Sequence, residues 1–243
     1  MPLIRRIRNL LRYGHGPAAR ARKKADKREA KRRRFESERW EHGGELSRRR
    51  YGSYEEYLRH QASKLDGIEE RLRENQDAEL AEFRERFRAC RSLAGARTVL
   101  CLGARLGTEV RALLELGHFA VGIDLNPGPE NPFVLPGDFH HLVFPDGSAD
   151  AVYSNALDHV FDLDRLVGEV SRVLAPGGVF VAEIETGYEE GHVPGDFEAI
   201  HWRDSDALVS RIADVGKLAV EEVLELGTTR RNQRRLISFR KAA

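Results

Sequence analysis

From Thr98 to the end of the chain, short apolar runs alternate with amphipathic helical patterns. Helices are expected over residues 108–116, 164–174 and near 204–215. Strands are expected at seven places, over residues 98–103, 119–124, 133–135, 150–155, 179–184, 218–227 and 234–241. Such alternation predicts an α/β fold with a mostly parallel sheet covered on both faces, and the final pair of strands predicts an antiparallel edge.

The first predicted strand ends in a glycine turn, Gly103-Ala104-Arg105-Leu106-Gly107. In an open parallel sheet, ligands bind beyond the carboxyl ends of the strands, so this turn is the first place to look for a site. Gly103 and Gly107 let the backbone approach a ligand closely, and a helix that begins near Gly107 offers free N–H groups to an anion. A tight turn with no ligand is the alternative interpretation.

The second predicted strand ends in Asp124, about twenty residues after the glycine turn, which is the spacing at which an acidic side chain accepts both hydroxyls of a ribose. Asp124 as a mere strand-end cap is the alternative. The turn lacks the G-K-[ST] that would hold nucleotide phosphates, which argues against a P-loop. Only about eight residues, three of them proline, follow before the next strand, so we expect a loop there rather than a helical crossover.

Four segments resemble the successive motifs of class I S-adenosylmethionine-dependent methyltransferases, in particular the methyltransferase type 11-like domain. These are "VLCLGARLG", "GIDLNP", "GDFHHLVFPDGSADAVYSNALDHV" and "VLAPGGVFVAEI", in this order. The resemblance covers about residues 97–241. It implies a Rossmann-like fold and S-adenosyl-L-methionine as the cofactor.

The resemblance also assigns roles to residues. The turn would hold the methionine end of the cofactor, Asp124 its ribose, and Asp138 with Phe139 its adenine, while Asn155 would lie near the sulfonium. The complete set of cofactor-binding residues expected on this basis is Gly103, Ala104, Arg105, Gly107, Asp124, Leu125, Gly137, Asp138, Phe139 and Asn155.

Two residues depart from the family's pattern. The usual acidic residue of the first strand is Cys101, and the middle glycine of the turn is Arg105. We interpret Cys101 as a small buried apolar residue, as we do Cys90. S-adenosylmethionine carries a carboxylate, which a guanidinium can bind through two parallel hydrogen bonds. Arg105 therefore either binds this carboxylate or faces solvent.

The chemistry requires little more than alignment, because the cofactor's methyl group is already electrophilic. A base is needed only if the acceptor is a hydroxyl. Asp158 and His159 follow the fourth strand, where the acceptor would approach, and are the expected catalytic residues. Capping of the next turn is the alternative role for both, and Glu183 and Glu185 are weaker candidates. No spacing typical of metal ligands is present, and we expect no metal.

Two helices are expected before the sheet. The first begins at a capping box formed by Ser53 and Glu56, and the second carries an apolar stripe and runs toward Arg97. Residues 51–95 would form a lid across the site. The lid side chains expected to face cofactor or substrate, or else merely to pack, are Tyr54, Tyr57, His60 and Lys64.

The first 50 residues differ in charge from the rest. They hold 18 Lys/Arg against 6 Asp/Glu, a net charge of +12, which leaves 22 against 33, or −11, for the others. Residues 3–12 read as a short basic amphipathic helix, and residues 19–34 lack large apolar side chains, so we expect them to be disordered in isolation. The expected organisation is a basic arm over residues 1–50, a helical lid over 51–95 and a cofactor-binding domain over 96–243.

The function expected from these features is methyl transfer from S-adenosylmethionine to a small molecule or a sugar-containing, glycan-type intermediate. One alternative is RNA methylation, with the basic arm contacting phosphates. Another is a non-catalytic binding protein that the arm tethers to an anionic membrane surface or an acidic partner. No apolar run reaches the roughly 18–20 residues of a membrane span, so a cytoplasmic location is expected, peripheral to the membrane if the arm binds lipid.

Overall fold

The computed structural model describes residues 17–229 and 232–243. The amphipathic helix expected over residues 3–12 lies outside these ranges. None of the described helices is long and apolar enough to cross a membrane.

Seven strands form the central sheet, in the order β5-β4-β3-β6-β7-β10-β9. The strands from β5 to β7 are parallel, whereas β10 runs antiparallel to both of its neighbours. Their bounds are β3 (Thr98–Leu102), β4 (Phe119–Asp124), β5 (Val134–Pro136), β6 (Ala149–Ser154), β7 (Leu174–Glu185), β9 (Leu218–Thr229) and β10 (Asn232–Lys241). The predicted mostly parallel sheet with an antiparallel edge is confirmed. Since β3 pairs with β4 on one side and with β6 on the other, the strand order reverses at β3, where open sheets bind ligands.

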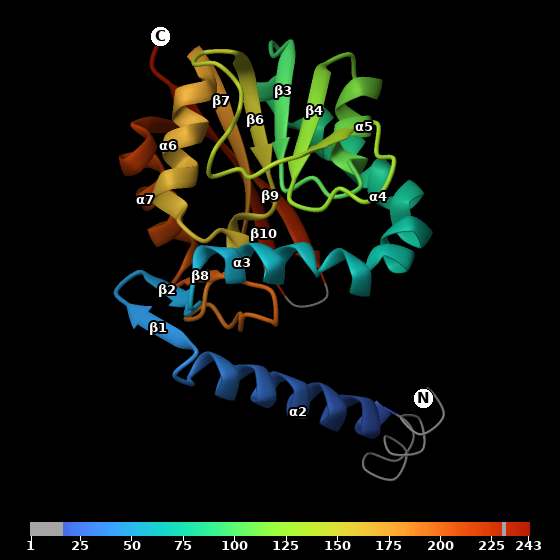
Figure 1. The fold of residues 1–243 in the computed structure, drawn as a ribbon, viewed down its shortest axis with the longest axis vertical. Helices are drawn as coiled ribbons and strands as arrows, with labels where there is room; N and C mark the ends of the chain where they lie inside the picture. Colours follow the sequence, from blue (N-terminus) through green and yellow to red (C-terminus); the bar gives the residue numbers. More distant parts are fainter. Residues whose placement is uncertain (1–16, 230–231) are drawn as a thin grey trace.

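Helices cover both faces of this sheet (Figure 1). On one face lie α4 (Glu69–Ala89) and α5 (Thr108–Glu115), and on the other α6 (Leu163–Val173) and α7 (Ser205–Gly216). The helix expected to run toward Arg97 ends earlier, at Ala89, and a 3-10 turn over Arg91–Leu93 follows. Residues 125–133, all of them described, form the loop that the sequence predicts between β4 and β5.

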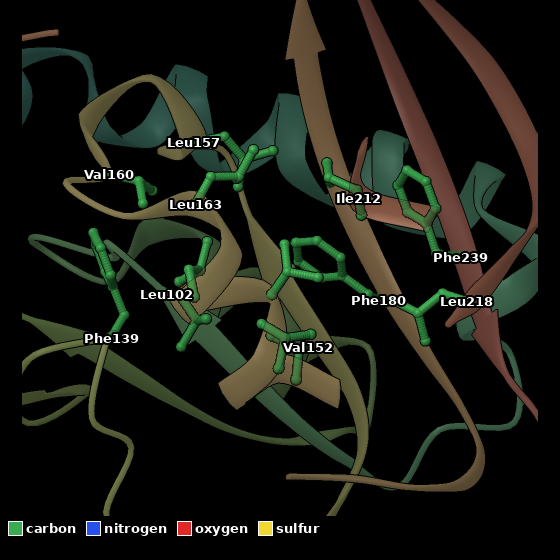
Figure 2. Packing of buried hydrophobic residues seen from close by; sticks show 14 of the residues in the cluster. Leu102, Phe139, Val152, Leu157, Val160, Leu163, Phe180, Ile212, Leu218 and Phe239 are labelled. Atoms are coloured by element: carbon green, nitrogen blue, oxygen red, sulfur yellow. The ribbon is translucent and has the colours of Figure 1, made fainter. Parts of the chain in front are cut away.

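The core explains why these segments fold as they do. Along α6, apolar residues recur every three or four positions, and Leu166, Val170 and Val173 are buried against β6 and β7. Figure 2 shows this cluster, in which Phe180 lies near Val152 and Phe239 lies near Ile212. Burying a side chain of this kind stabilises the fold by about 1.5–3 kcal/mol.

The opposite face carries a second apolar cluster, which α4 and α5 cover. Cys101 of β3 lies within it, fully buried and free, and Cys90, which follows α4, is buried and free as well. Both cysteines therefore pack as the sequence predicts.

The lid helix α3 (Tyr54–Ala62) crosses the carboxyl ends of the parallel strands (Figure 1). Its N-cap Ser53 accepts a hydrogen bond from the Glu56 backbone N–H, as expected. The Glu56 carboxylate, however, accepts from the N–H of Gly52 at 2.6 Å rather than from that of Ser53. A short 3-10 turn, η1 (Leu65–Gly67), then leads into α4.

A second, three-stranded sheet lies beyond the lid. It consists of β1 (Trp40–Gly43), β2 (Leu46–Arg49) and β8 (Ile200–Trp202), in the order β1-β2-β8. The sequence did not predict these strands, because three or four residues are too few to show an alternation of apolar and polar side chains. Through this sheet, residues 40–49 pair with residues 200–202.

The basic stretch expected to be disordered in isolation is a helix in this structure, α2 (Pro17–Phe35). Composition alone misled the prediction, since Ala, Arg, Lys and Glu are strong helix formers. The helix is also anchored at one end, where Phe35 is buried between Trp40 and Tyr188. Figure 1 shows α2 along the lower side of the molecule, where its Arg28 side chain donates to Gly191 O at 3.1 Å.

Candidate active site

A pocket opens beneath α3, at the place where β3, β4 and β6 end. Two groups of residues line it. The lid contributes Tyr57, Gln61, Ala62, Lys64 and Leu65. The sheet side contributes Gly103, Arg105, Asp124, Leu125, Asn126, Phe139, Ala156 and His159.

Two glycines shape the turn after β3. Gly103 has φ +75°, and a Cβ atom there would lie 2.5 Å from the Cβ of Ala156. Gly107 has φ +73°, and a Cβ atom there would lie 2.8 Å from the Cβ of Phe133. Gly103 lines the pocket, whereas Ala104 and Gly107 are buried behind the wall.

The backbone N–H groups of this turn are used within the protein. The N–H of Gly103 donates to Ile123 O at 2.8 Å, and that of Gly107 donates to Ala104 O at 2.7 Å. The first residues of α5 do not line the pocket, and burial raises the pKa of Glu109 to about 8. The N–H groups at the start of α5 therefore lie outside the pocket lining, and Arg105 and Lys64 bring positive charge to the pocket.

Asp124 lies at the end of β4 and faces the pocket. Its Oδ2 accepts the N–H of Arg105 at 2.9 Å, and its Oδ1 accepts the N–H of Asn126 at 2.8 Å. Burial raises the pKa of this carboxyl, and the two amides partly offset that effect. A carboxylate oxygen can accept two hydrogen bonds, so both oxygens keep capacity for a ligand donor. The strand-end cap and the ligand acceptor are thus compatible roles for Asp124.

Only some of the residues expected to bind adenine line the pocket. Phe139 lines the pocket together with Leu125, whereas Gly137 and Asp138 lie outside its lining. The Asp138 Oδ2 accepts the hydroxyl of Tyr54 at 2.6 Å, and its Oδ1 accepts the N–H of His140 at 2.9 Å. Although burial opposes it, the hydrogen bonds from His140 and Tyr54 hold the pKa of Asp138 well below its usual range.

Arg105 adopts a left-handed backbone conformation, with φ +43°. For a residue with a Cβ atom this costs roughly 1–2 kcal/mol, and such strain is concentrated at functional sites. Asn131 holds the conformation, since its Nδ2 donates to Arg105 O at 2.9 Å. Arg105 lines the pocket, and burial, with the charge of Arg105 added, lowers the pKa of Lys64.

The four lid residues singled out in the sequence fall into two pairs. Tyr57 and Lys64 line the pocket, and the Tyr57 hydroxyl donates to His159 O at 3.1 Å. Tyr54 binds Asp138 instead, and His60 stacks on Phe197 with ring centroids 4.9 Å apart.

His159 ends a short 3-10 turn, η3 (Leu157–His159), that follows β6. Its Nδ1 donates to Phe197 O at 2.9 Å, and its Nε2 contacts Lys64 Nζ. Burial, with the charge of Lys64 added, lowers the pKa of His159, so the imidazole is neutral at pH 7. Asp158 Oδ1 lies 3.6 Å from the same Nε2, and burial raises the pKa of Asp158. Only His159 of this pair lines the pocket.

The structure does not bring every candidate to the pocket. Asn155 is exposed and outside the lining, where Ala156 takes its place. Glu183, a weaker candidate base, is buried and binds Arg86 and Tyr153. Within the described residues, no group of three or more His, Cys, Asp and Glu side chains is arranged to hold a metal ion.

One part of the site gave no signal in the sequence. Residues 186–199, here called the strap, connect β7 to β8. The strap supplies Phe197 O, which accepts from His159 Nδ1 and, at 2.8 Å, from Gln61 Nε2. The N–H of Ala199 donates to Asp158 O at 2.7 Å. The strap thereby fixes the orientation of the Asp158–His159 turn.

Known proteins share parts of this sequence. The family model described as a methyltransferase domain matches residues 100–182. A sterol 24-C-methyltransferase of Aspergillus fumigatus is 53% identical over 47 residues, 19% of this chain and 12% of the relative. The 24-methylenesterol C-methyltransferase 2 of Oryza sativa subsp. japonica is 32% identical over 151 residues, 52% of this chain and 42% of the relative. The matches thus span less than half the length of these curated relatives.

Among solved structures, the fold is similar to that of 1,6-didemethyltoxoflavin-N1-methyltransferase of Burkholderia thailandensis, crystallised with 1,6-didemethyltoxoflavin and S-adenosylhomocysteine. The TM-score is 0.63 at 14% identity, over 84% of this chain and 99% of that one. The family model, the strand order and the glycine turn all indicate a methyltransferase domain. Residues 100–182 of this chain therefore match a methyltransferase domain, and its fold is similar to that of a solved methyltransferase.

Proposed function

We propose that this protein transfers the methyl group of S-adenosylmethionine to a small-molecule or sugar-containing acceptor. The observation that carries the proposal is the pocket at the strand-order reversal. There Asp124, Phe139 and Arg105 line the sheet side while Tyr57 and the rest of the lid cover it.

The residues present fit the cofactor. Asp124 has acceptor capacity left for ribose hydroxyls, and Phe139 with Leu125 offers apolar surface for adenine. Arg105 and Lys64 offer positive charge for the carboxylate. When bound, S-adenosylmethionine supplies an electrophilic methyl group on a sulfonium.

The protein's own contribution is to orient the acceptor and to receive its proton. Alignment of reacting groups supplies up to roughly 7–11 kcal/mol in favourable cases. His159 is neutral and faces the pocket, so its Nε2 is the group that accepts a proton from an acceptor hydroxyl. Asp158, 3.6 Å away, stabilises the imidazolium that results.

The roof over the pocket favours a small acceptor over a polymer. Asn126 Nδ2 donates to Ala62 O at 2.8 Å, which ties the end of α3 to the loop after β4. Gln61 ties the same helix to the strap through Phe197 O. A pocket closed in this way admits a compact molecule or the end of a sugar chain.

Calorimetric titration with S-adenosylhomocysteine tests the proposal most directly. We expect one molecule bound per chain, with an affinity that falls in Asp124→Ala. A panel of hydroxylated small molecules with labelled S-adenosylmethionine then identifies the acceptor. A folded protein that binds neither S-adenosylhomocysteine nor S-adenosylmethionine would refute the proposal.

Helix α2 supports attachment to a polyanion as an additional role. Residues 17–35 hold ten Lys/Arg against Asp26 and Glu29, and most of these side chains are exposed. Near an anionic surface, each such cation contributes about 1 kcal/mol. We expect binding to phosphatidylserine vesicles or to RNA that weakens with salt and is lost when Arg20, Lys24 and Lys27 are changed to Gln. Binding to neither would leave α2 as a solvated helix.

A further inference from the structure

Lys64 occupies a position that bears on the proposed function, and its role as inferred here rests on that function. Lys64 follows α3, and its Nζ contacts His159 Nε2. Because His159 Nδ1 donates to Phe197 O, Nε2 carries the lone pair of the neutral ring. The ammonium of Lys64 donates into that lone pair. The nitrogen that must accept a proton from the acceptor is therefore already occupied.

The charges on the pocket wall give Lys64 a second possible partner. Among the described residues that line the pocket, Arg105 and Lys64 carry the positive charges. They lie close enough that burial, with the charge of Arg105 added, lowers the pKa of Lys64 to about 8. An anion bound between these two side chains would relieve both the burial and the repulsion.

The backbone of the turn limits how an anion can be held. The N–H of Gly103 donates to Ile123 O of β4, that of Gly107 donates to Ala104 O, and the start of α5 does not line the pocket. Cys101 is buried behind the wall. Anion binding in this pocket thus depends on the guanidinium of Arg105 and the ammonium of Lys64.

We propose that Lys64 exchanges partners when the cofactor binds: its ammonium pairs with the cofactor's carboxylate beside Arg105 and leaves His159 Nε2 free to accept a proton. Lys64 is then a cofactor-binding residue that also controls the base. Without cofactor, it keeps Nε2 occupied. With cofactor, His159 becomes available at the time when a methyl donor is present.

The charges around His159 set the direction of the expected change. Burial, Lys64 and Arg105 lower its pKa, and Glu198 of the strap raises it. Asp158 lies beside Nε2, and Asp124 and Glu198 act on Lys64 itself. Pairing of Lys64 with a carboxylate cancels part of the positive field, so the pKa of His159 rises on binding.

The test compares the wild-type protein with Lys64→Met, which keeps the length of the side chain without its charge. The exposed Lys217→Met is the matched control. The ligands are S-adenosylhomocysteine and its decarboxylated analogue, titrated by calorimetry. The pKa of His159 is followed by NMR of the imidazole nitrogens, with and without each ligand.

We expect Lys64→Met to bind S-adenosylhomocysteine at least tenfold more weakly and the decarboxylated analogue as the wild type does. In the wild type, S-adenosylhomocysteine raises the His159 pKa and the analogue does not. In Lys64→Met, the pKa is already raised before ligand is added. Lys217→Met behaves as the wild type.

Equal affinities of wild type and Lys64→Met for S-adenosylhomocysteine would overturn the inference. So would a wild-type His159 pKa that does not change on binding, a result that requires no variant to fold. Failure of the wild type to bind either ligand would instead overturn the proposed function, and this inference with it.

Discussion

The two walls of the pocket are built differently. On the sheet wall, the bonds that shape the site start from backbone N–H groups, as from Gly103 N–H to Ile123 O and from Arg105 N–H to the Asp124 carboxylate. On the lid wall, they are side-chain bonds between segments far apart in the chain, as from Tyr57 to His159 O or from Gln61 to Phe197 O.

This difference separates a rigid wall from an adjustable one. A turn held by its own backbone and by glycines with positive φ keeps its shape without a ligand. A lid held by single side-chain hydrogen bonds, each worth about 0.5–1.5 kcal/mol, can open to admit a ligand. We therefore expect substitutions on the sheet wall to have larger effects than those on the lid wall.

Gly103→Ala should have the largest effect. The left-handed backbone costs roughly 1–2 kcal/mol for a residue with a Cβ atom, and the collision with Ala156 adds roughly 1–3 kcal/mol. We expect urea denaturation to show a loss of about 3 kcal/mol, the combined scale of these two effects, and calorimetry to show no cofactor binding. Gly117→Ala is the matched control, because Gly117 has φ +92° but a Cβ atom at this position would have nothing within 4 Å. Similar losses for the two variants would mean that the approach to Ala156 is unimportant.

Asp124→Ala should come next. It removes the acceptor of two ribose hydroxyls, and we expect cofactor affinity to fall by about 1.5–3 kcal/mol, the scale of hydrogen bonds to a charged group. Asp77→Ala, at an exposed position of α4, is the control for the loss of a carboxylate. An unchanged affinity in a folded Asp124→Ala protein would contradict the ribose assignment.

Arg105→Ala should have a smaller effect, about 1 kcal/mol on the affinity for S-adenosylmethionine and S-adenosylhomocysteine, because the side chain is only half-buried. A ligand without the carboxylate should be affected much less. Arg105→Lys should recover part of the loss, since an ammonium keeps the charge but not the planar fork. Equal losses for all ligands would show that Arg105 shapes the turn only. The exposed Arg88→Ala serves as control.

Tyr57→Phe tests the lid wall and should have the smallest effect on binding. It removes the hydrogen bond to His159 O, and we expect the free energy of unfolding to fall by about 1 kcal/mol while cofactor affinity stays within about twofold. Thermal unfolding and calorimetry measure the two quantities. A loss of affinity as large as that of Asp124→Ala would contradict the expectation that the lid wall matters less for binding than the sheet wall.

The same distinction explains what the sequence could predict. The sheet, the glycine turn and the loop after Asp124 follow from local patterns of apolar residues, glycine and proline, and the structure has all three. The contributions of Phe197 and Ala199 come from tertiary contacts with no local pattern, so the strap was missed. The positive φ of Arg105 could not be predicted from the sequence either, because glycine is the residue that indicates such a conformation.

Sequence patterns were a poor guide to those elements whose structure depends on tertiary packing. The composition of residues 19–34 is typical of a disordered segment. In the structure, however, Phe35 packs against Trp40 and Tyr188 and anchors the helix that these residues form. The strands of the small sheet are too short to be recognised alone. For the lid, the sequence predicted that Tyr57 and Lys64 face the site, but it did not predict the His159 atoms that they contact.

The pairing of β2 with β8 has a consequence for the order of folding. Leu46 pairs with Trp202, so the ribosome has completed most of the chain before β2 meets its partner. The lid helix lies between β2 and the first strand of the large sheet, and its bond from Gln61 to Phe197 O forms only after residue 197 has been made. Contacts of such sequence separation form slowly. The newly made chain therefore completes its cofactor turn well before the roof that covers it.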